Sequence, residues 1–136
     1  MATWLRKLTG SRRKNTAEIS RATTLGDYTA TLTDADLRRT FDTALRDNDT
    51  ATMLATLREA STRTIGLTPF DCQLRGAQEL LKGNVIQMAT GEGKTLVGAL
   101  AAIIYAHQGR KIHCITVNSY LAGRAVSYTH LRAHET

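Results

Sequence analysis

Apolar residues recur every three or four positions through the middle of the chain, which predicts two amphipathic helices. The first begins at Thr33, where Thr33 and Asp36 resemble a capping box with Asp in place of Glu. The stretch DNDT at 47–50 should end this helix and cap the next one, which should stop near Gly66. Their apolar faces comprise Leu37, Phe41, Ala44 and Leu45, and then Met53, Leu54, Leu57 and Ala60.

The same spacing continues into a third predicted helix with clear start signals. Thr68 can cap it, Pro69 suits the first helical position, and Asp71 lies in the first turn. Gly83 provides the break at the other end. Gln73 lies at the edge of the apolar stripe, where an amide can face a cleft. The stripe consists of Phe70, Leu74, Ala77 and Leu81.

After the third helix the apolar pattern changes to short uninterrupted runs. Residues 84–88 and 112–117 are typical of strands, and the apolar run 96–105 between them predicts a buried helix ending near Gly109. Another helix could open at 118–121. The order strand, glycine-rich loop, helix, strand is that of a βαβ unit. We therefore expect an α/β fold: a partial P-loop core with parallel strands, preceded by N-terminal helices.

Residues 1–32 form a basic lead-in that we expect to be mobile. The part from 9 to 32 is polar and threonine-rich without a sustained period, which favours irregular structure. Five of the positive charges behind the net charge of +6 precede Glu18, namely Arg6, Lys7, Arg12, Arg13 and Lys14. With Trp4, Leu5 and Leu8, residues 1–14 could lie on an anionic membrane or an acidic partner, or could be a frayed terminus.

Composition excludes several classes of protein. The 136 residues are 42% hydrophobic with one proline, which indicates a single globular domain or part of one. Neither a secretory signal nor a transmembrane run is present, so we expect a cytosolic chain. Cys72 and Cys114 form no motif, and His130 and His134 lack the glutamate of a zinc-protease helix.

The stretch QMATGEGKT at 87–95 is a near match to the phosphate-binding pattern G-x-x-x-x-G-K-[ST]. Met88 occupies the place of the first glycine. That glycine precedes the backbone N–H groups that bind phosphate at a helix N-terminus, which here belong to residues 91–95. The strand before the loop and the apolar helix after it favour a nucleotide site over a chance match.

Each residue of the loop has an expected role. Gly91 and Gly93 allow the tight turn, and Glu92 supplies its N–H while its carboxylate points away. Lys94 can neutralise the β and γ phosphates, and the Thr95 hydroxyl can ligate Mg²⁺. Such a loop reads phosphates and not bases, so spacing alone does not separate ATP from GTP.

Three ordered motifs resemble the SecA preprotein translocase ATPase family. They are GLTPFDCQL at 66–74, QMATGEGKT at 87–95 and TVNSYLA at 116–122. Methionine at position 88 is a trait of that family. The form MATGEGKTL, the preceding GNVIQ and the basic lead-in are more similar to the accessory, second SecA of actinobacteria-like organisms than to the housekeeping form.

The resemblance implies an ATP-driven motor that moves unfolded preproteins through the SecYEG channel, working in the cytoplasm and peripherally at the cytoplasmic face of the cell membrane. Gln73 matches the glutamine that recognises adenine in the family, and 91–95 matches its phosphate loop. The sequence departs from the family pattern at four positions, with Thr68 for Arg, Cys72 for Val, Gln87 for Glu and Ser119 for Asp.

The resemblance covers residues 33–125, which we interpret as the N-terminal part of the first motor domain. Residues 126–136 look like translated sequencing-adapter sequence and are interpreted as a non-native tail after a truncated gene. Neither the acidic Walker B motif nor a catalytic arginine motif is found, so no catalytic residue is assigned. We expect the chain alone to bind ATP weakly or fold poorly, and not to hydrolyse it.

Two other classes of protein remain open. A nucleic-acid helicase shares the same loop, but the chain is poor in the aromatic and basic residues that bind strands, so no nucleic acid is expected. A non-catalytic nucleotide-binding or membrane-docking module would need only the basic terminus and the loop.

Overall fold

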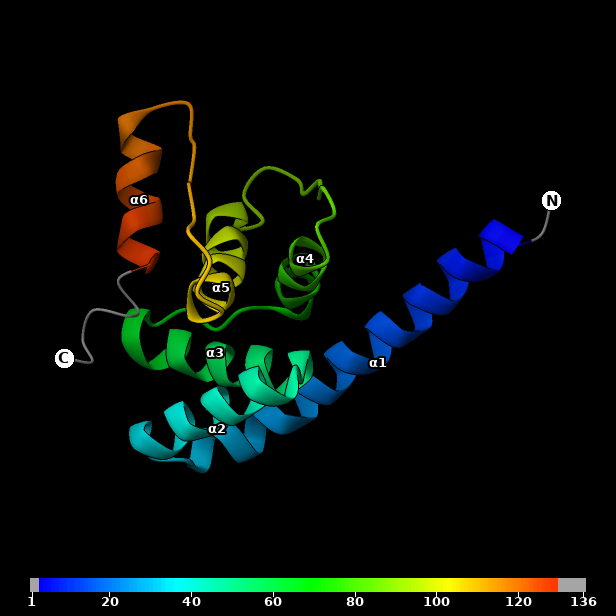
Figure 1. Ribbon diagram of the computed structural model, residues 1–136. Coiled ribbons are helices and arrows are strands. Elements are labelled where there is room, and N and C mark those ends of the chain that lie inside the picture. Colours follow the sequence, from blue (N-terminus) through cyan, green and yellow to red (C-terminus); the bar gives the residue numbers. More distant parts are fainter. Residues whose placement is uncertain (1–2, 130–136) are drawn as a thin grey trace.

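The computed structural model describes the backbone of residues 3–129, which form helices joined by turns and extended segments (Figure 1). No described residue is assigned to a β-strand. Residues 130–136, and with them His130, His134 and most of the interpreted tail, lie outside the described residues. The helices are α1 (Thr3–Thr31), α2 (Asp34–Asp47), α3 (Thr50–Ile65), α4 (Asp71–Leu81), α5 (Lys94–His107) and α6 (Ser119–Thr129).

The predicted parallel-strand α/β fold is therefore wrong for the part of the chain that the structure describes. Residues 84–88 and 112–117 are extended but do not hydrogen-bond to each other or to any other described segment as strands do. Several of their apolar side chains are in solvent, with Val85 98% and Ile115 91% exposed, whereas Ile86 and Met88 are partly buried against the core. An extended segment becomes a strand only when another one pairs with it, and no described segment does.

The expectation of irregular structure over residues 9–32 is also wrong, since α1 covers this stretch up to Thr31. Thr23, Thr24, Thr29 and Thr31 donate their hydroxyls to carbonyls of the same helix, as when Thr23 donates to the Ile19 carbonyl at 3.0 Å. The C-terminal half of α1 then packs along α3 and buries Ile19, Ala22 and Thr29. Its N-terminal turns project away from the other helices (Figure 1).

The two predicted amphipathic helices are confirmed with their caps. The Thr33 hydroxyl accepts the Asp36 N–H at 3.2 Å, and Asp49 accepts the Thr52 N–H at 3.3 Å. Asn48 between them takes the left-handed conformation that ends α2. The third helix was placed two residues too early, since α4 starts at Asp71 and Phe70, not Thr68, precedes it as the cap residue.

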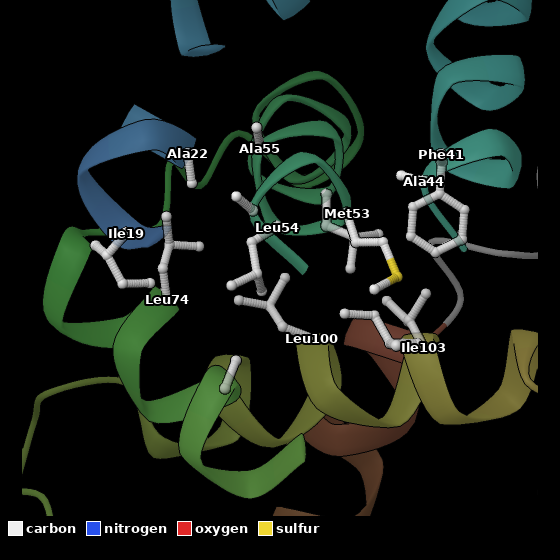
Figure 2. Packing of buried hydrophobic residues seen from close by; sticks show 14 of the residues in the cluster. Ile19, Ala22, Phe41, Ala44, Met53, Leu54, Ala55, Leu74, Leu100 and Ile103 are labelled. Carbon is white, nitrogen blue, oxygen red and sulfur yellow. The ribbon is translucent and has the colours of Figure 1, made fainter. Parts of the chain in front are cut away.

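One hydrophobic core joins the helices, with α3 packed against α1, α2 and α5. Figure 2 shows Leu54 and Leu100 in the middle of this core, with Leu74 toward α1 and Met53 toward α2. Leu54, Leu74 and Leu100 are fully buried. The predicted buried helix is thus confirmed as α5, and it rests on the N-terminal helices without a sheet.

Met88 shows why the loop can begin without a glycine. Its side chain packs against the core, and its sulfur lies 3.7 Å from the position that a Cβ on Gly76 would occupy. That Cβ would also lie 2.9 Å from Cγ1 of Val97, so the bare Gly76 lets α4 and α5 approach closely. Met88 fills the edge of this contact and fixes the start of the loop.

Candidate nucleotide-binding site

The glycine-rich segment turns sharply into the N-terminus of α5. Gly91 and Gly93 have φ angles of 86° and 79°, in the left-handed region that glycine adopts without steric cost. Gly93 is the cap residue, so Lys94 and Thr95 are the first two residues of the helix. The predicted glycine-rich turn, followed directly by the start of a helix, is therefore present in the structure.

Several amides of this turn have no backbone acceptor. Within residues 3–129, the N–H groups of Gly91, Gly93, Lys94 and Thr95 donate to no carbonyl, and the first capping bond of α5 is Val97 N–H to the Gly93 oxygen at 3.2 Å. Free N–H groups at a helix N-terminus, reinforced by the helix dipole, attract anions. The turn thus offers a set of donors suited to phosphate oxygens.

The charged side chains of the loop both contact the Ala89 peptide. The Lys94 ammonium donates to the Ala89 carbonyl at 3.2 Å, and the Glu92 carboxylate accepts the Ala89 N–H at 2.8 Å. Glu92 was expected to supply its N–H to phosphate and to turn its carboxylate away, but its N–H donates to the Ala89 carbonyl at 3.3 Å and its carboxylate folds back onto the loop. Both side chains are exposed, so an incoming polyphosphate can reach them.

Gln73 connects α4, the third predicted helix, to the loop. Its amide nitrogen donates to the Glu92 carbonyl at 2.9 Å, and its amide oxygen accepts the Phe70 N–H at 2.9 Å. The side chain is nearly buried and lies so close to Gly93 that a Cβ there would clash with it. The structure therefore brings Gln73 and the loop together, although 19 residues separate it from Glu92.

Phe70 is a further candidate for contact with the base of a nucleotide, although its spacing predicts a side chain in the core. Its ring is 70% exposed and follows directly on the fully buried Pro69. Its backbone N–H donates to Gln73, which contacts the glycine-rich turn, and an exposed aromatic ring is a surface on which a purine base can stack. The signal was available, since Phe70 lies three residues before Gln73 and at the start of a helix, where a side chain need not face the core.

The loop fits Mg²⁺ bound together with a nucleotide. Thr95 is half-buried in the first turn of α5, and its hydroxyl is a hard oxygen ligand of the kind Mg²⁺ accepts beside phosphate oxygens and water. Among the described residues there is no group of three or more His, Cys, Asp or Glu side chains that could hold a metal by themselves. The protein would thus supply one ligand, and the nucleotide would supply others.

Two further features bear on other functions. A surface hollow lies between α1, α2 and α3 and is bordered by Tyr28, Asp36, Arg39 and Asp49, among others. It includes none of the residues predicted to contact a nucleotide. Across residues 3–129, no helix has both the length and the apolar character needed to cross a bilayer.

Comparison with known proteins gives one family. The SecA DEAD-like domain matches residues 3–131. A protein translocase subunit SecA 2 of Corynebacterium jeikeium is 58% identical over 77 residues, covering 57% of this chain and 10% of that protein. SecA 3 of Mycolicibacterium vanbaalenii is 47% identical over 116 residues, covering 82% of this chain and 15% of that protein.

A third relative agrees. SecA 2 of Mycobacterium leprae is 46% identical over 115 residues, 81% of this chain and 15% of that protein. The chain thus spans 10% to 15% of the length of these relatives. The domain match extends from α1 to α6 and includes the glycine-rich turn, Gln73 and the N-terminal helices. The chain belongs to the SecA DEAD-like domain family.

Proposed function

We propose that this chain binds ATP with Mg²⁺ at the turn before α5, as part of a protein translocase motor. The observation that carries the proposal is the set of N–H groups of Gly91, Gly93, Lys94 and Thr95, which have no backbone acceptor, with the Lys94 ammonium beside it. The hydrogen bond from Gln73 to the Glu92 carbonyl supports it, because it ties a base-recognition residue to the phosphate loop.

In this proposal each residue has a distinct part. The amides of Gly91, Gly93 and Lys94 hold phosphate oxygens, and the Lys94 ammonium moves from the Ala89 carbonyl to the β and γ phosphates. Bound Mg²⁺ would neutralise phosphate charge, with Thr95 as its ligand from the protein. Gln73 is placed to read adenine.

At the level of the whole protein, we propose an ATP-driven translocase that moves preproteins through SecYEG at the cytoplasmic face of the membrane. The relatives are named as protein translocase subunits, and two of those given above carry the name SecA 2. These names, and the motif MATGEGKTL, support assignment to the accessory form. No described feature favours a helicase.

Nucleotide binding is tested by titrating the chain with ATP and Mg²⁺ in a calorimeter. Lys94→Ala should weaken ATP binding at least about 10-fold, since it removes the cation that contacts two phosphates. Lys111→Ala is the matched control, because Lys111 follows the far end of α5, about 20 Å along the helix. Equal affinities for the two variants would refute the proposed site.

We also propose that residues 1–14 bind an anionic membrane surface. The N-terminal turns of α1 project away from the helical core, which leaves a basic segment free to reach a bilayer (Figure 1). Flotation with vesicles containing anionic lipid should recover the chain, and deletion of residues 1–14 should abolish recovery. Recovery that survives the deletion would rule out this segment as the anchor.

A further inference from the structure

The peptide of Ala89 is held by one residue of the loop from both sides. The Glu92 N–H donates to the Ala89 carbonyl at 3.3 Å, while the Glu92 carboxylate accepts the Ala89 N–H at 2.8 Å. The same carbonyl accepts the Lys94 ammonium at 3.2 Å. Glu92 therefore closes a tight ring within the loop, and Lys94 is drawn into that ring.

This arrangement opposes the binding of a polyphosphate in two ways. The Lys94 ammonium must leave the Ala89 carbonyl before it can contact a phosphate. The Glu92 carboxylate places a negative charge in the same short turn whose amides would receive a phosphate. The carboxylate and the phosphate would repel one another, even at a solvated site. Neither Gly91 nor Gly93 can replace this contact, since glycine has no side chain.

We propose that Glu92 is a positioning residue that holds the phosphate loop closed on Ala89 and limits its affinity for ATP. The inference deepens the proposed nucleotide function and rests on it. Binding of ATP then includes release of the Glu92 carboxylate from the Ala89 amide. The Gln73 bond to the Glu92 carbonyl uses the backbone and can persist when the carboxylate leaves.

The contact itself is tested without nucleotide, by following hydrogen exchange at the Ala89 amide. Glu92→Ala removes the acceptor, so this amide should exchange at least about 5-fold faster than in the wild type. Glu92→Gln keeps an acceptor oxygen and should retain most of the protection. Asp47→Ala, an exposed carboxylate on α2, is the control and should leave the amide unchanged. Equal exchange in Glu92→Ala and wild type would overturn the proposal.

The effect on affinity is tested by titration with ATP and Mg²⁺. Glu92→Gln removes the charge and should tighten ATP binding about 3-fold, and Glu92→Ala removes charge and contact and should tighten it about 10-fold. ATP binding that is unchanged or weaker in both variants, while Lys94→Ala abolishes it, would overturn the role of Glu92 and leave the nucleotide site intact. Absence of any ATP binding in the wild type would overturn the nucleotide function, and with it this inference.

Discussion

The helical layer of α1 to α3 and the loop segment, residues 84–93, which contains the glycine-rich turn, differ in how far their apolar side chains are buried. Leu54 on α3 has no exposed surface, whereas Val85 in the loop segment is 98% exposed. The helical layer also has capped ends and ion pairs, as between Arg63 and Asp34 at 2.7 Å. The loop segment contacts the helices through Ile86 and Met88, through the hydrogen bonds of Asn84 to Glu79 and through the Gln73 hydrogen bond to Glu92.

The difference shows which parts of this fold depend on local sequence. A helix satisfies its backbone within itself and needs only one apolar face covered by neighbours. An extended segment needs a second one beside it to satisfy its backbone. Among residues 3–129 the helices have their neighbours, while residues 84–88 and 112–117 do not pair.

The largest effect is expected at the centre of the helical layer. Leu54→Ala should lower the free energy of unfolding by about 2–5 kcal/mol, because it opens a cavity where α3 meets α5. Leu67→Ala is the matched control, since Leu67 is 41% exposed and should cost far less. Urea unfolding monitored by circular dichroism measures both. A similar loss in the two variants would show that the core is not centred on α3.

The next largest effect is expected at the close contact between α4 and α5. Gly76→Ala should destabilise the chain by about 1–2 kcal/mol, because the new Cβ would lie only 2.9 Å from Cγ1 of Val97. Gly98→Ala is the matched control on α5, where a Cβ meets no atom within 4 Å. That variant should be stabilising by up to about 1 kcal/mol from helix propensity. If both variants shifted the unfolding midpoint in the same direction from the wild type, the close α4–α5 contact would be contradicted.

A smaller effect is expected at the cap of α3, and it should depend on pH. Burial alone would raise the pKa of Asp49, but hydrogen bonds from Thr52 and Arg21 outweigh it and hold the pKa below its ordinary value of 3.8. The charged form therefore stabilises the fold above pH 3.8, and this contribution is lost as the pH falls through the lower, folded-state pKa.

Replacing Asp49 tests this contribution directly. Asp49→Ala should cost about 1 kcal/mol at pH 7, as removal of a helix cap does. Asp49→Asn keeps a capping oxygen without the charge, so its difference from the wild type should shrink as the pH is lowered from 6 toward 3. Urea unfolding at several pH values measures both variants. A constant difference would show that the charge of Asp49 adds nothing.

Sequence predictions succeeded where the signal is local and failed where the structure depends on residues far apart in the chain. The caps at Thr33 and Asp49 and the start of α5 were predictable because their signals lie within four residues of the helix end. The contact of Gly76 with Val97, and the hydrogen bond from Gln73 to Glu92, join residues about 20 apart and left no local signal. The strands were predicted from apolar runs, which favour an extended backbone but do not identify a segment to pair with.

Within the candidate site, the sequence motif names candidate residues but does not give their geometry. The motif assigns the residues from Gly91 to Thr95, but not the direction of the Glu92 side chain. That direction follows from the turn itself, which brings the Ala89 N–H within 2.8 Å of the carboxylate. The exposure of Phe70 was missed because its spacing from Leu74 matches the buried stripe of α4.

The smallest effect is expected in the loop segment. It tests most directly whether the apolar side chains of this segment are less buried than those of the helices. Val85→Ala should change the free energy of unfolding by less than about 0.5 kcal/mol, because the side chain makes almost no buried contact. Val97→Ala makes the same chemical change at a fully buried position on α5 and should cost several times more. Urea unfolding measures both variants, with one common dependence of the free energy of unfolding on urea concentration. If Val85→Ala costs as much as Val97→Ala, residues 84–88 are packed in solution, and the contrast between the two regions disappears.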